Sequence, residues 1–171
     1  MSLSSNSLPN PPLVSIVMPS YNQALYLEKA IQSVLNQDYP NIEFFVVDGG
    51  SSDESVEIIR KYHKTHPDRL VWWVSEKDKG QADAINKGFK RAKGEIFAWL
   101  NSDDIYLDGA VNKAVNVFRD DPDLGFVYSN IKSIDKDGHV FNEITYDDWG
   151  VEDLMAFCIL GQAGVFMRRD A

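Results

Sequence analysis

The chain has 171 residues, of which 44% are apolar and 25% are charged, as expected for an ordinary soluble globular protein of about one domain. Its formal net charge of -9 argues against sequence-independent nucleic-acid binding, which needs a basic surface to displace counterions from the phosphate backbone. The sequence has no run of about 18 apolar residues and no basic, then apolar amino-terminal signal, which predicts a cytoplasmic protein without a membrane span of its own. A peripheral position at the inner face of the membrane stays open. The single cysteine, Cys158, cannot form an internal disulfide and fits a reducing compartment.

The two ends of the chain differ from its middle. Residues 1–12 are rich in Ser, Asn and Pro and have no periodicity, which predicts a flexible tail before a domain at 13–171. Residues 164–171 read as a strand with no closing segment after it. We therefore expect a domain that is incomplete at its carboxyl end.

Between these ends, apolar runs of strand length alternate with amphipathic helical patterns. This β-α-β-α-β-α-β order predicts a single α/β domain with a Rossmann-like, mostly parallel sheet that carries helices on both faces. Ser51 and Glu54 have the spacing of a capping box that opens the second helix. The expected strands are 14–18, 42–47, 70–74 and 96–100, with helices at 27–35, 51–62 and 81–92; a helix at 109–119, a strand at 126–129, a hairpin at 131–144 and a short helix at 151–160 follow.

Two adjacent carboxylates, Asp103 and Asp104, follow the apolar run at 96–100. Hard cations such as Mg²⁺ or Mn²⁺ prefer carboxylate oxygen, and Mg²⁺ commonly takes one or two protein carboxylates while substrate phosphates supply further ligands. The pair therefore predicts a divalent cation and a phosphate-bearing ligand. The alternative is a polar turn in which Asp103 or Asp104 caps the next helix.

Polar clusters follow all four strands, and in an open parallel sheet ligands bind outside the carboxyl ends of the strands. Each cluster alone is also compatible with a simple turn, but four at one edge favour a site. The chain has neither a Gly-x-Gly-x-x-Gly motif after the first strand nor a P-loop, so dinucleotide redox chemistry and P-loop phosphoryl transfer lose support. The clusters are 19–22 (PSYN), 48–53 (DGGSSD), 76–80 (EKDKG) and 101–104 (NSDD).

Four segments in this order and spacing resemble the family 2 glycosyltransferases of the GT-A fold, over residues 14–169. The resemblance implies transfer of a sugar from a nucleoside-diphosphate-sugar, with uridine favoured, to an acceptor hydroxyl with inversion. The acceptor would be a saccharide or lipid-linked, and the reaction would serve polysaccharide or glycoconjugate synthesis. The segments that carry it are 14–22 (VSIVMPSYN), 46–53 (VVDGGSSD), 79–94 (KGQADAINKGFKRAKG) and 101–104 (NSDD).

The resemblance also assigns roles to residues. Asp48 would accept a hydrogen bond from the base, and the family's Asp-x-Asp motif maps onto residues 101–103. Because Asn101 brings no charge, the Mg²⁺ or Mn²⁺ ion would rest mainly on Asp103, with Asp104 as the second candidate. The expected donor-binding residues are Pro19, Ser20, Tyr21, Asn22, Asp48, Gly49, Gly50, Lys79, Gly80, Asp83, Asn86, Asn101 and Ser102.

The catalytic base is not identified. In related enzymes it lies downstream of a segment like the one at 161–169, so we expect it beyond Ala171; Glu152 and Asp153 lie before that segment and are weak candidates. Trp149, in a polar loop, is the one tryptophan expected near an acceptor. A non-catalytic nucleotide-sugar-binding module or pseudoenzyme remains an alternative, and a nucleotidyltransferase is disfavoured because no basic glycine-rich loop follows the first strand.

Overall fold

A six-stranded sheet forms the centre of the computed structural model, which describes residues 8–146, 152 and 160–171. The strand order is β3-β2-β1-β4-β8-β5, and the first four strands in that order are parallel, whereas β8 runs antiparallel to β4 and β5. None of the helices in the described part is long and apolar enough to cross a membrane. The strands are β1 (Val14–Ser20), β2 (Ile42–Asp48), β3 (Leu70–Ser75), β4 (Ile96–Trp99), β5 (Phe126–Val127) and β8 (Phe166–Arg168).

The register of the parallel strands brings their carboxyl ends together. Ser20 pairs with Asp48, and Asp48 pairs in turn with Ser75 of β3. β1 and β2 are buried at nearly every position, as expected for strands that are covered on both faces. The polar residues that follow β1, β2, β3 and β4 therefore meet at one edge of the sheet.

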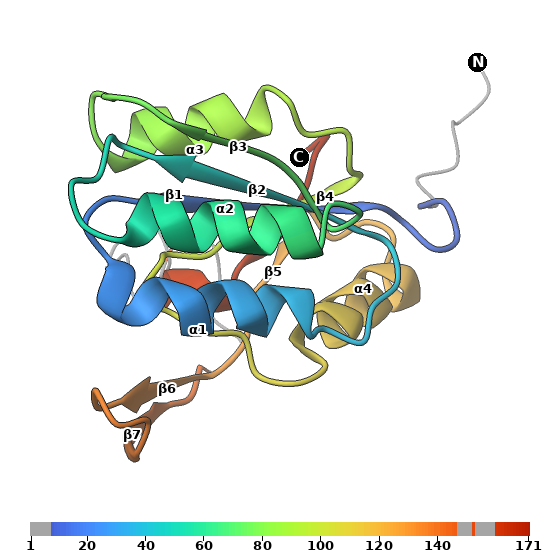
Figure 1. Ribbon diagram of the computed structural model, residues 1–171. Coiled ribbons are helices and arrows are strands. Elements are labelled where there is room, and N and C mark those ends of the chain that lie inside the picture. Colours follow the sequence, from blue (N-terminus) through green and yellow to red (C-terminus); the bar gives the residue numbers. More distant parts are fainter. Residues whose placement is uncertain (1–7, 147–151, 153–159) are drawn as a thin grey trace.

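Helices cover both faces of the sheet (Figure 1). α1 (Ala24–Leu35), α2 (Ser55–Thr65) and α4 (Ala110–Asp120) pack on one face and share the larger core cluster. Of the helices in the described residues, α3 (Gln81–Phe89) packs on the other face, over the smaller cluster around Val17. This arrangement confirms the predicted fold class and the predicted order of strands and helices.

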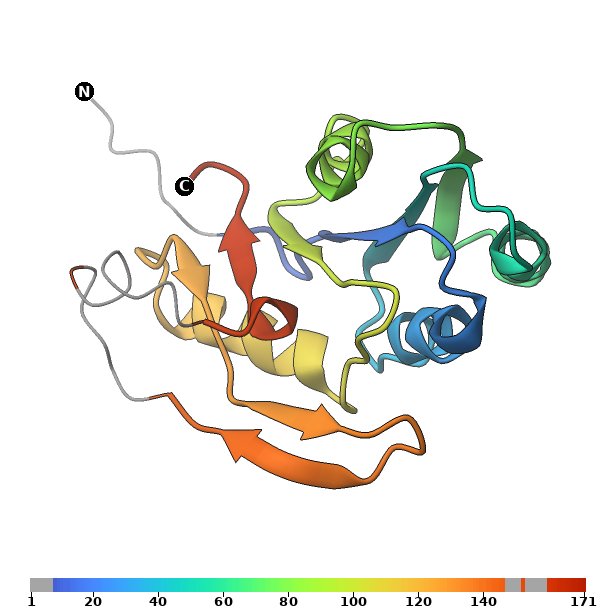
Figure 2. The ribbon, with the colours of Figure 1, turned by 90° about the vertical axis from the view of Figure 1, so that its left-hand side faces the viewer.

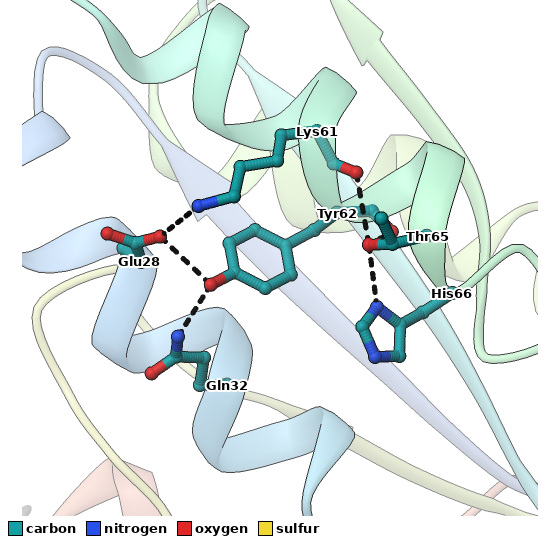
Figure 3. Close-up of polar contacts among 6 residues, drawn as sticks. All are labelled: Glu28, Gln32, Lys61, Tyr62, Thr65 and His66. Atoms are coloured by element: carbon teal, nitrogen blue, oxygen red, sulfur yellow. Dashed lines mark hydrogen bonds and ion pairs between the residues drawn. The ribbon is translucent and has the colours of Figure 1, made fainter.

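α1 and α2 lie side by side and are joined by a polar network (Figure 3). Glu28 of α1 accepts hydrogen bonds from Lys61 and from the Tyr62 hydroxyl, at 2.7 and 2.9 Å, and Gln32 donates to the same hydroxyl. These bonds, first that from Lys61, lower the pKa of Glu28. Because the Glu28 and Lys61 side chains are largely exposed, the pair contributes little to stability, and burial of Tyr62 dominates this contact.

A hairpin stands apart from the main sheet (Figure 2). Its strands, β6 (Ile131–Ile134) and β7 (Val140–Ile144), form a two-stranded antiparallel sheet of their own, joined by a turn in which Gly138 has a φ of 90°. The predicted hairpin with an Asp-Gly turn is therefore confirmed. A short 3₁₀ helix, η1 (Gln162–Gly164), leads into β8.

Several predicted boundaries were wrong. The capping box does not form, because α2 begins only at Ser55 while the Ser51 hydroxyl donates to Asp48. α3 ends at Phe89, where a turn bonded to the Gly88 carbonyl replaces the last predicted helical turn. The strand expected at 126–129 has only two residues, and the helix expected at 151–160 falls largely outside the described residues.

Part of the predicted tail contacts the domain. The Tyr39 hydroxyl donates to the Pro12 carbonyl at 2.6 Å, and the Asn41 side chain donates to the Pro11 carbonyl at 3.0 Å. The Asn10 side chain also accepts a hydrogen bond from Arg119, so these contacts begin three residues before the expected boundary at residue 13, which itself stays a prediction.

Candidate functional site

A cavity of about 530 Å³ opens at the carboxyl ends of the parallel strands. Its walls come from the loops after β1, β2, β3 and β4 together with the first turn of α3. All four predicted polar clusters thus contribute to one cavity. The lining residues are Pro19, Ser20, Tyr21, Gln23, Gly49, Lys77, Asp78, Gly80, Gln81, Ala84, Asn101, Ser102 and Asp103.

Asp48, which we expected to contact a base, lies beneath the cavity wall and does not line it. The residue is fully buried, and its Oδ2 accepts hydrogen bonds from the backbone N–H groups of Gly50 and Ser51 and from the Ser75 hydroxyl. Its Oδ1 accepts from the Ser51 hydroxyl at 2.5 Å. Both carboxylate oxygens are therefore engaged in shaping the loop after β2.

Asn22 and Gly50 also shape loops and do not line the cavity. Asn22 has a left-handed backbone with a φ of 51°; its N–H donates to the Ser51 hydroxyl and its side-chain oxygen accepts from the Ser52 N–H. Gly50 has a φ of 84°, and a Cβ there would lie 3.3 Å from the Lys77 nitrogen. These residues lock the loops after β1, β2 and β3 to one another.

Asp78 occupies the part of the wall where we expected Asp48. Its Oδ1 accepts a hydrogen bond from the Gly80 N–H at 2.8 Å. A Cβ placed on Gly49 would lie 2.9 Å from Asp78 Oδ2 and 3.3 Å from Cδ2 of the Tyr21 ring, so these three residues are packed against one another. The Tyr21 side chain is 62% exposed and faces this cavity.

Asn101 lies at the centre of a short chain of side-chain hydrogen bonds. Gln81 donates to Asn101 Oδ1 at 2.6 Å, and Asn101 Nδ2 donates to Asp104 Oδ2 at 3.1 Å. Burial, and then the charge of Asp103, raises the pKa of Asp104, while the Asn101 bond opposes the rise. Asp104 is thus turned into the wall, whereas Asp103 is exposed and lines the cavity.

The residues after β4 form a turn, but they do not cap the next helix. The Asp104 N–H donates to the Asn101 carbonyl at 3.1 Å, and the N-cap of α4 is Gly109, without a side-chain cap. The alternative interpretation of Asp103 and Asp104 as helix caps is therefore wrong.

The oxygen atoms available here fit a divalent cation whose remaining ligands are supplied by a phosphate. Asp103 offers an exposed carboxylate in the cavity, while Asp104 and the oxygen of Asn101 are already hydrogen-bonded. One free carboxylate matches the way Mg²⁺ is held beside substrate phosphates. Among the described residues, three potential metal ligands also lie together elsewhere, at Asp135, Asp137 and His139, but this group is exposed and bonded within its own turn.

Three expected donor-binding residues on the β3–α3 side do not line the cavity: Lys79, Asp83 and Asn86. Asp83 instead accepts the Lys79 N–H at 3.2 Å and pairs with Lys87 at 3.4 Å. These contacts, first the Lys79 N–H, lower the pKa of Asp83. The segment therefore holds the start of α3 in place beside the cavity.

Sequence reasoning missed five lining residues as individual site residues. Two of them, Lys77 and Asp78, belong to the polar cluster identified after β3. The others follow from the same rule about strand ends, because the first turn of a helix after a strand borders the same edge. The missed residues are Gln23, Lys77, Asp78, Gln81 and Ala84.

Comparison with known families agrees with this geometry. Residues 15–163 match the model of "Glycosyl transferase family 2". The chain belongs to this family. A chondroitin synthase of Escherichia coli is 33% identical over 140 residues, which are 82% of this chain and 20% of that protein. An uncharacterized glycosyltransferase of Rickettsia typhi is 38% identical over 130 residues, which are 75% of this chain and 39% of that protein.

Solved structures show the same fold. The mannosyltransferase PcManGT from Pyrobaculum calidifontis, in complex with GDP-Man and Mn²⁺, matches with a TM-score of 0.71 and 25% identity, over 93% of this chain and 45% of that one. S. aureus TarS 1-349 in complex with UDP-GlcNAc matches with a TM-score of 0.56 and 26% identity, over 63% of this chain and 31% of that one. The architecture of this family 2 member is thus of the GT-A type.

Proposed function

We propose that the chain forms the donor-binding part of a glycosyltransferase, which transfers a sugar from a nucleoside-diphosphate-sugar to an acceptor hydroxyl. The observation that carries the proposal is a cavity whose lining brings Tyr21, Lys77 and Asp103 together at one sheet edge in a family 2 chain. An aromatic ring, a basic group and a metal-binding carboxylate are what a base, a diphosphate and its cation require.

Each side chain has a task in the transfer. A bound Mg²⁺ or Mn²⁺ would neutralise the negative charge that develops on the leaving diphosphate. Asp103 would hold this ion, Lys77 attracts the diphosphate, and Asn101 contacts the ribose or metal-bound water without adding charge. With the donor held this way, an acceptor hydroxyl attacks in line on the opposite side of the sugar, which inverts the anomeric centre.

The donor and acceptor classes are part of the proposal. We favour a UDP-sugar; S. aureus TarS 1-349 is described with UDP-GlcNAc, and PcManGT with GDP-Man. The acceptor would be a saccharide or lipid-linked hydroxyl, in polysaccharide or glycoconjugate synthesis. A cytoplasmic protein, peripheral at the inner face of the membrane when the acceptor is lipid-linked, fits such a reaction.

We assign the catalytic base, which takes the proton of the acceptor hydroxyl, to none of the cavity residues. Glu152 is exposed, and Asp153 and Trp149 lie outside the described residues. Because Asn101 replaces an acid of the Asp-x-Asp motif, a second candidate function is a non-catalytic module that binds nucleotide-sugars. Release of free nucleoside diphosphate in the presence of acceptor separates the two functions.

Calorimetric titration of this chain with UDP and GDP, each with Mn²⁺ and with a chelator, tests donor binding directly. We expect one nucleotide to bind with Mn²⁺ and to bind much more weakly with the chelator. Asp103→Ala should remove the difference between the two conditions. A folded protein that binds neither nucleotide would reject the proposed function.

A further inference from the structure

Asp48 does not present a hydrogen-bond acceptor to a ligand in the cavity. Four hydrogen bonds from Gly50, Ser51 and Ser75 engage its two oxygens, and the residue is fully buried. Because Asp48 is fully buried and does not line the cavity, a ligand could reach its oxygens only if the loop after β2 moved. The group that meets a base must therefore be sought among the residues that line the cavity.

Asp78 has the free acceptor that Asp48 lacks. Its Oδ1 accepts the Gly80 N–H, and no residue in the described part of the chain donates to Oδ2. Oδ2 lies over Gly49, where even a Cβ would approach it to 2.9 Å, and the Tyr21 ring borders the same point. The Asp78 carboxylate, the Gly49 backbone and the exposed Tyr21 ring thus lie together in the cavity wall.

A second observation points to a ligand here. The Ser20 hydroxyl is buried, has no hydrogen-bond partner among the residues that the structure describes, and belongs to a residue that lines this cavity. Buried polar groups are nearly always hydrogen-bonded, so an unpartnered hydroxyl in a cavity wall marks a place where a ligand completes the bonding. Ser20 lies at the end of β1, directly before Tyr21 and beside Asp48 in the sheet register.

We propose that Asp78 is the specificity-determining residue for the nucleobase, with its Oδ2 accepting the N–H on the base edge while the Tyr21 ring packs on the base plane. Asp48 is a positioning residue that fixes the loop carrying Gly49. This inference rests on the proposed function, because it concerns the donor of the same site.

The assignment predicts a class of base. Uracil carries an N–H at N3 and guanine carries one at N1, and each can donate to a carboxylate. Cytosine carries a lone pair at N3, which a carboxylate oxygen repels. Because hydrogen bonds to a charged group are stronger than neutral ones, we expect UDP or GDP to bind at least about 10-fold tighter than CDP.

Asp78→Asn is the decisive variant because it is isosteric. The amide oxygen is expected to keep the bond from the Gly80 N–H, which places the NH₂ group where Oδ2 now lies. A donor at that position opposes the N–H of uracil or guanine and suits the N3 lone pair of cytosine. Calorimetric titration of wild type and variant with UDP, GDP and CDP, all with Mn²⁺, should show the preferred nucleotide weakened by about 10-fold or more and CDP unchanged or strengthened.

Asp68→Asn is the matched control. Asp68, like Asp78, is an acid close to an end of β3, but it is exposed, precedes the strand and lies outside the cavity, so the variant should keep wild-type binding. Thermal unfolding of both variants checks that they fold.

The outcomes separate the two proposals. If wild type binds none of the three nucleotides, the proposed function fails. If it binds them without discrimination or prefers CDP, or if Asp78→Asn leaves UDP and GDP binding unchanged or weakens all three equally, this inference alone fails. The wild-type preference decides the question even if the variant does not fold.

Discussion

The carboxylate of Asp53 caps α1, a helix to which it does not belong: Oδ2 accepts the N–H of Ala24, 29 residues earlier in the chain, at 3.0 Å. Its Oδ1 accepts the N–H of Ser55, the first residue of α2, also at 3.0 Å. One side chain therefore satisfies free N–H groups at the start of two helices and ties the loop after β1 to the loop after β2.

Asp53→Ala should lower the free energy of unfolding by about 1 to 2 kcal/mol, the usual effect of losing a cap. Hydrogen bonds, first that with Ser55, lower the pKa of Asp53 in the folded protein. The stabilisation is therefore complete above the ordinary Asp pKa of about 3.9 and is lost as the pH falls through the lowered folded value. Urea unfolding of wild type and variant at pH 7 and at decreasing pH measures the loss of stability and its pH dependence. If the two free energies of unfolding differed by the same amount at every pH, the ionised Asp53 carboxylate would not be the source of the stabilisation.

Gly49→Ala should weaken nucleotide binding without unfolding the protein. The new Cβ would lie 2.9 Å from Asp78 Oδ2 and 3.3 Å from the Tyr21 ring, so both side chains must move. The Asp78 carboxylate is the far end of a flexible side chain, so the cost to folding is small. We expect an unchanged melting temperature and at least about 10-fold weaker nucleotide binding by calorimetry. Unchanged affinity would show that these two side chains do not touch the ligand.

Asp103→Asn and Asp104→Asn should differ in their effect on metal dependence. Asp103 is exposed in the cavity, whereas Asp104 is half-buried and bonded by Asn101. We expect Asp103→Asn to bind nucleotide equally with Mn²⁺ and with a chelator, while Asp104→Asn keeps the advantage of Mn²⁺. The opposite result would move the metal to Asp104.

Gln81→Ala should reduce nucleotide binding indirectly, through Asn101. Gln81 donates to Asn101 Oδ1 at 2.6 Å and so fixes the amide that in turn bonds to Asp104. Without Gln81 the Asn101 amide is free to rotate, and we expect several-fold weaker binding with Mn²⁺ and a smaller change with a chelator. Ala82→Gly, a change at the neighbouring helical residue outside the cavity, controls for altered helix stability. Equal losses in both variants would mean that the effect comes from the helix.

The sequence was sufficient to predict the sheet, its helices and the edge that forms the cavity. The apolar pattern that distinguishes strands from helices is visible within each short segment of sequence. It was not sufficient to predict which polar side chain at that edge faces the cavity. Asp48 is the last residue of β2 and Asp78 follows β3, and both accept backbone N–H groups. The difference is tertiary: Asp48 meets Ser75 of the next strand, whereas Asp78 lies over a glycine. No local pattern encodes these neighbours.

Gly88→Ala tests how closely α3 must approach the sheet to place Gln81 at the cavity. A Cβ on Gly88 would lie 2.5 Å from Val17 Cγ1, inside the smaller core cluster. Overpacking typically costs about 1–3 kcal/mol, and the better helix propensity of Ala returns up to about 1 kcal/mol, so we expect a net loss of about 1–2 kcal/mol in urea unfolding. Val17→Ala removes the two methyl groups that clash. A double-mutant cycle should therefore show the two changes destabilising by less than their sum. Additive losses would mean that α3 is not held against Val17.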